Sequence, residues 1–108
     1  MIFMNSLVDG AMVHEEEILL LYDYMDRYYR LPDPYDKYSS FDKITYGRWA
    51  IEEIIQMLVD NPTYDSDQLV YEFAVTMRTL AARKRSVSFI FEIAADTAEE
   101  IREKVLLY

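Results

Sequence analysis

The chain has 108 residues, a formal net charge of −9 at neutral pH, 52% hydrophobic residues and no cysteine. This composition excludes a disordered chain, because such chains bury too little apolar surface to offset their ordering entropy. The absence of cysteine excludes disulfides, thiolate chemistry and zinc sites built on sulfur. At this length we expect one domain spanning residues 1–108, and the two glycines and three prolines favour long helices over a turn-rich β fold.

The sequence lacks the pattern of a secreted or membrane-spanning protein. The first basic residue is Arg27, so the N-terminus has no basic start before an apolar stretch. The longest fully apolar run, residues 18–22, is too short to cross a bilayer. We therefore expect a soluble cytoplasmic protein that does not contact membranes, and the strong negative charge disfavours nucleic acid as a partner.

The first predicted helix covers residues 14–30. Its apolar residues fall at helical spacing and form one stripe: Ile18, Leu21, Tyr22, Met25, Tyr28 and Tyr29. Three glutamates in the first turn suit the positive end of the helix dipole, and Pro32 and Pro34 end the helix. Before it, the apolar segment 1–8 is open to three interpretations: a short strand, a docked arm or a lead-in to the helix.

Two further helices are predicted in the middle of the chain. The second begins after a cap at Ser39 or Ser40 and ends at Asn61-Pro62, with Gly47 leaving open whether it is one helix or two. The third begins at a capping box and runs to about Arg83. Both have core-facing stripes: Ile44, Ile51, Ile54, Ile55 and Leu58 in one, Leu69, Phe73, Met77 and Leu80 in the other.

The last quarter of the chain admits two interpretations. Read as a helix, it has a nearly heptad stripe of Val87, Ile90, Ala94, Ala98, Ile101 and Val105. Read as a short β-strand at about 86–94, it alternates apolar and other residues and is followed by a capping box at Thr97 and Glu100. A lone strand would need the N-terminal segment or a second copy to pair with. The expected fold is mainly α, a compact bundle of about four helices, with this strand left open.

No standard catalytic, metal or cofactor site is predicted. The only histidine, His14, lies among glutamates at a helix start and is interpreted as a solvated surface residue. Asp65-Ser66-Asp67 begins like a calcium loop but lacks the later ligands, so a capping role explains it better. The carboxylate clusters at 52–53 and 99–103 are typical of a solvated helix face, although they could do acid–base chemistry if they converged in a cleft. We expect a non-enzymatic protein without cofactors.

Tyrosine is unusually abundant, with ten in the chain. Stacked aromatic residues can bind single-stranded nucleic acid, but the tyrosine-rich stretch 22–46 lacks the basic groove that such binding requires. Tyrosine is also frequent in protein interfaces. We assign three of these tyrosines, Tyr22, Tyr28 and Tyr29, to the edge of the core. Three others, Tyr24, Tyr35 and Tyr38, are assigned to an exposed contact surface.

A small basic cluster follows in the second half of the chain: Arg78, Arg83, Lys84 and Arg85. Its cations could contact nucleic acid or the acidic first half of a neighbouring copy. They also suit the negative end of the third helix, which is the interpretation we favour.

From these observations we predict that the protein is a small acidic protein–protein interaction module, with a homodimer as one form. Two alternatives remain: an acidic decoy that mimics nucleic acid, and a DNA-contacting regulator that uses the basic cluster at 78–85. An enzyme whose carboxylates converge only in three dimensions is a further rival.

Overall fold

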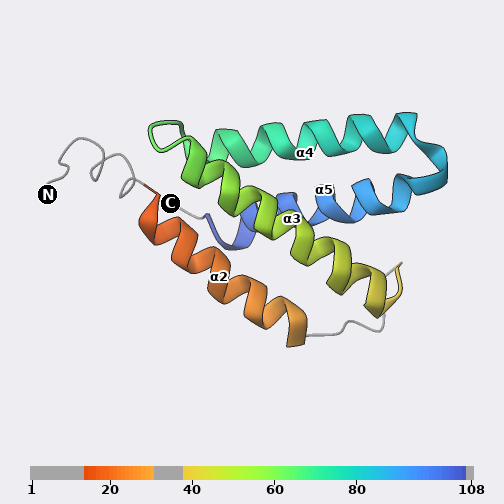
Figure 1. Cartoon of the computed structure of the whole chain (residues 1–108), viewed down its shortest axis with the longest axis horizontal. Helices are drawn as coiled ribbons and strands as arrows, with labels where there is room; N and C mark the ends of the chain where they lie inside the picture. The colour runs from red at the N-terminus through yellow and green to blue at the C-terminus, as the bar shows by residue number, and fades with distance from the viewer. Residues whose placement is uncertain (1–13, 31–37, 107–108) are drawn as a thin grey trace, which may run out of the picture.

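The computed structural model describes residues 14–30 and 38–106. In this part of the chain four α-helices follow one another: α2 (Glu15–Arg30), α3 (Ser40–Asp60), α4 (Ser66–Arg83) and α5 (Ser88–Lys104). A short 3-10 helix, η1 (Arg85–Val87), leads into α5. The predicted mainly α bundle of four helices is therefore confirmed (Figure 1). The interpretations offered for segment 1–8 lie outside the described residues.

The bundle is built around a hairpin of two antiparallel helices, α4 and α5. Figure 1 shows α3 crossing α5, and α2 running beside α3 on the side away from α4. The largest fully buried side chains come from all four helices: Leu21, Ile51, Ile54, Leu58, Val70, Ile93 and Ile101. This shared core is what holds the helices together, because most of the stability of a helix in a protein comes from packing its apolar face against neighbours.

Helix α3 is continuous through Gly47, so the open question of one helix or two is answered in favour of one. Ser39 caps its start, with Oγ accepting a hydrogen bond from the Asp42 backbone N–H at 3.1 Å. The helix ends at Asp60, and its C-cap residue Asn61 directly precedes Pro62. Gly47 is therefore not a break; it faces the ring of Tyr28 on α2.

Helix α4 starts where the sequence predicts, but of the predicted capping box only the bond to the Asp65 carboxylate forms, and the Gln68 side chain bonds elsewhere. The Asp65 carboxylate accepts a hydrogen bond from the Gln68 backbone N–H at 2.9 Å, which satisfies one of the free donors of the first turn. The Gln68 side chain donates to Glu72 on the next turn. This geometry confirms the capping role of Asp65 that we preferred over a calcium loop.

Residues 86–94 are helical, and of the two interpretations the strand is wrong. Residues 85–87 form the 3-10 helix η1, and residues 88–104 form α5. A helix satisfies its own backbone groups, whereas a lone strand would leave an unpaired edge. The capping box predicted at Thr97 and Glu100 is also wrong, because both residues lie inside α5.

Ion pairs between α4 and α5 tie the hairpin together along its exposed side. Arg78 contacts Asp96 at 2.7 Å and Glu99 at 2.8 Å. Arg102 makes two hydrogen bonds to Asp67, at 2.8 and 3.0 Å, and these hold the pKa of the Asp67 carboxyl below its usual range. All five groups are partly exposed, so each pair is expected to stabilise the fold by only about 0.5–1 kcal/mol. No helix of the described part of the chain is both long enough and apolar enough to cross a membrane.

Candidate functional site

The tyrosines of α2 face the bundle differently from what the sequence predicts. Tyr24 is buried, and its ring meets that of Tyr28 edge-on at a centroid distance of 5.7 Å. Tyr22, assigned to the core, is instead 53% exposed. The two assignments fail together because the buried face of α2 is centred on Leu21, Tyr24 and Tyr28, with Tyr22 rotated away from it. The Tyr29 side chain lies outside the described part of the structure.

Tyr24 is held by a carboxylate of α5. Its hydroxyl donates a hydrogen bond to Glu100 Oε1. Burial, and then this hydrogen bond, raise the pKa of Tyr24 well above its usual range, so the hydroxyl keeps its proton and remains a donor. Tyr24 therefore joins α2 to α5 and is unavailable to a partner, which corrects its predicted place on a contact surface.

Tyr28 makes the second link between α2 and α5. The Thr97 hydroxyl donates to the Ile93 backbone carbonyl at 2.8 Å, so its oxygen can accept from the Tyr28 hydroxyl at 3.1 Å. The ring passes directly over Gly47 of α3, where a Cβ would overlap its outer atoms. A glycine is needed at this position because the ring occupies the space of a side chain.

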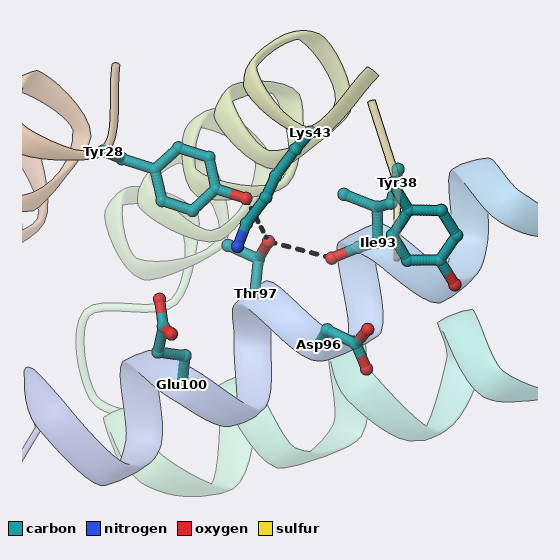
Figure 2. Close-up of a pocket in the computed structure, with 7 residues that line it drawn as sticks. All are labelled: Tyr28, Tyr38, Lys43, Ile93, Asp96, Thr97 and Glu100. Carbon is teal, nitrogen blue, oxygen red and sulfur yellow. Dashed lines mark hydrogen bonds between the residues drawn. The ribbon is translucent and has the colours of Figure 1, made fainter. Parts of the chain in front are cut away.

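A small pocket opens beside these tyrosines (Figure 2). Its volume is about 80 Å³, and it is lined by Tyr28, Tyr38, Lys43, Ile93, Asp96, Thr97 and Glu100. The space fits a few water molecules but is far below the ~300 Å³ at which sites for small organic ligands begin. Figure 2 shows the Lys43 ammonium pointing toward Thr97, whose hydroxyl is already engaged. We therefore interpret the pocket as a hydrated seam between α2, α3 and α5.

Tyr38, which the sequence assigns to an exposed contact surface, is only partly exposed in the structure. Tyr38 is half-buried, and its hydroxyl donates to Glu92 of α5. It thus lies at the rim of the same seam, while Tyr35 lies outside the described residues. The tyrosine-rich stretch that stands out in the sequence is used, where it is described, largely to satisfy polar groups on one face of α5.

His14 is not a solvated surface residue. Its side chain is buried, and Nε2 lies 2.8 Å from the backbone carbonyl of Asn61 at the end of α3. The imidazole thereby donates to a backbone carbonyl just past the last residue of α3, and the same carbonyl also accepts from the Tyr64 backbone N–H at 3.2 Å. The interaction fastens the start of α2 to the end of α3, so His14 has a structural role that its acidic sequence neighbours did not indicate.

The carboxylates do not gather into a centre in the described part of the chain. No group of three or more histidine, aspartate or glutamate side chains there could hold a metal ion. Glu99 is paired with Arg78, and Glu100 accepts from Tyr24. Glu52 does line a groove on α3, but the other lining residues described carry no second acid.

The basic cluster is divided by the structure. Arg78 lies in the ion pairs with α5, whereas Arg83 and Lys84 are exposed at the end of α4. The Lys84 backbone N–H closes that helix by donating to the Leu80 carbonyl. The Arg85 side chain lies outside the described part. The exposed cations therefore occupy the negative end of a helix dipole, the arrangement that the favoured interpretation expects.

The outer face of α3 is a feature that sequence reasoning missed. Six residues follow one another along it at helical spacing, and we call them the outer stripe: Phe41, Thr45, Arg48, Glu52, Gln56 and Val59. Five of the six side chains are exposed and Arg48 is half-buried; the apolar side chains at the two ends are Phe41, 74% exposed, and Val59, 52% exposed. The stripe lies opposite the buried face formed by residues such as Ala50, Ile54 and Leu58.

A groove of about 380 Å³ accompanies the outer stripe. Its described lining residues all belong to α3: Phe41, Ile44, Thr45, Arg48, Trp49 and Glu52. Trp49 forms one flank and leans on Phe73 of α4, with ring centroids 6.3 Å apart. Elsewhere, the exposed ring of Tyr71 on α4 is covered by the Arg102 guanidinium at 5.0 Å. The α3 groove therefore combines exposed apolar side chains with a depression that can receive those of another helix.

Comparison of the chain with protein-family models, with curated proteins and with solved structures gave no match.

Proposed function

We propose that the protein is a small, acidic, non-enzymatic interaction module whose contact surface is the outer face of α3. The observation that carries this proposal is the groove beside the outer stripe, with Phe41 bare at one end and Trp49 on its flank. Large apolar and aromatic side chains around a depression, with an arginine among them, are the typical centre of a protein interface.

The chemistry of the groove supports binding over catalysis. Its described lining offers one carboxylate and one guanidinium, without a nucleophile paired to a base. In the small pocket between α2 and α5, the Tyr28 and Thr97 hydroxyls are engaged in holding these two helices together. We therefore assign the interaction surface to α3 rather than to the pocket between α2, α3 and α5 or to the basic cluster.

A photo-cross-linking amino acid placed at position 41 tests this assignment in the cells or lysate that contain the protein. We expect irradiation to yield covalent adducts from position 41, because a bound partner would cover that side chain. The matched control carries the same amino acid at position 22, another exposed aromatic position, on α2. Equal adduct yields at the two positions, or none at position 41, would reject the α3 face as the contact surface.

A further inference from the structure

The residue types of the outer stripe are arranged symmetrically about its centre, with apolar residues at the ends, polar residues next and charged residues in the middle. Phe41 and Val59 lie nine residues before and after position 50, and Arg48 and Glu52 lie two residues before and after it. The stripe is therefore apolar at both ends, and its centre carries one positive and one negative charge. Because 18 residues make about five helical turns, Phe41 and Val59 lie on the same line along the helix.

From this pattern we infer that the partner of the α3 face is a second copy of the same chain, packed with its α3 antiparallel about a two-fold axis near position 50. The inference rests on the proposed function of that face. The two-fold operation brings Phe41 against the partner's Val59 and Arg48 against the partner's Glu52. Each contact occurs twice, as in any two-fold interface.

Charge decides the orientation of the two helices. In the antiparallel arrangement both central contacts join an arginine to a glutamate. A parallel two-fold arrangement would instead place Arg48 beside the partner's Arg48 and Glu52 beside the partner's Glu52. Like charges in contact across an interface are strongly disfavoured, so the stripe selects the antiparallel arrangement.

Trp49 lies near the proposed axis. It is one residue from position 50 and on the flank of the stripe, so it faces the partner's Trp49 across the axis. The groove in front of it accepts side chains of the second α3 in the manner of ridges packing into grooves. Paired aromatic residues at the centre, with charges and apolar ends around them, give the interface an anchor of the kind that dominates binding energy.

The test exchanges the central charges in two separate chains, R48E and E52R. Each variant alone would place like charges opposite each other twice, so we expect its self-dissociation constant to rise about tenfold or more. An equimolar mixture of the two variants restores opposite charges at both contacts, and we expect it to form a heterodimer about as tightly as the unmodified chain. Sedimentation equilibrium near physiological ionic strength, where the charge of −9 on each chain is screened, measures all three affinities.

Two control variants make the same charge changes at positions outside the outer stripe. Glu53 is exposed beside Glu52 but off the stripe, and Arg83 is exposed at the end of α4, so E53R and R83E should leave the affinity unchanged. Circular dichroism checks the fold of each variant. F41D serves as an independent variant should R48E fail to fold, because Phe41 is the most exposed of the large hydrophobic side chains described. We expect F41D to be monomeric.

The results separate this inference from the proposed function. Weak single variants with a tight mixture support the antiparallel dimer. An unmodified chain that remains monomeric up to about 1 mM, or R48E and E52R variants that associate as tightly as it does, would overturn the inference. Should position 41 then still cross-link to a different protein, the interaction module would stand with another partner. Absence of both self-association and adducts would remove both proposals.

Discussion

Replacing Gly47 with alanine is expected to destabilise the protein by about 2 kcal/mol, although alanine is the better helix former by ~1 kcal/mol. The new Cβ would overlap the outer atoms of the Tyr28 ring. That ring has little room to move, because it is buried and its hydroxyl is bonded to Thr97. Urea-induced unfolding followed by circular dichroism measures the change in the free energy of unfolding.

The same substitution in a Tyr28→Leu background gives the opposite sign. The leucine lacks the outer ring atoms that collide with the Cβ, so only the helix propensity of alanine remains. We expect G47A to stabilise the Y28L variant by up to about 1 kcal/mol. A G47A variant more stable than the unmodified chain would contradict the close approach of α2 and α3 at this position.

The second large effect concerns the orientation of α2. Leu21→Ala should destabilise the protein by about 3 kcal/mol, because Leu21 is fully buried and its loss leaves a cavity. Leu19→Ala, the same substitution two positions earlier, should change stability by less than about 0.5 kcal/mol, because Leu19 is 61% exposed. The difference between the two unfolding midpoints reports directly which face of α2 enters the core. Equal losses would contradict the buried face centred on Leu21 and Tyr24.

Features that depend on neighbouring residues were predictable from the sequence. The cap at Ser39, the cap at Asp65 and the end of α3 before Pro62 all follow from short-range hydrogen bonding and sterics. The approximate limits of α2, α3 and α4 follow in the same way, whereas the start of α5 was left open between a strand and a helix. Position 47 shows where such reasoning ends: the glycine suggests a break locally, but its actual reason is a ring on another helix.

Features that depend on distant partners were not predictable. Tyr22 and Tyr24 are equally plausible core residues by type and spacing. The buried one is Tyr24, whose hydroxyl donates to Glu100, a residue 76 positions later in the chain. His14 lies among glutamates in sequence but is buried against the end of α3. The outer stripe was overlooked for the same reason, since an apolar residue such as Val59 is known to be exposed only once the buried face of α3 is known.

A second α3 packed on the outer face of α3 would shield Trp49, the single tryptophan of the chain, which lies on the flank of that face. Acrylamide quenching of its fluorescence should be measured across a dilution series of the unmodified chain and of R48E. We predict that quenching of the unmodified chain falls as protein concentration rises, because dimerisation shields the indole, while quenching of R48E stays high. Quenching that is independent of concentration, or that falls equally in both chains, would show that α3 does not pair with a second α3 through these charges.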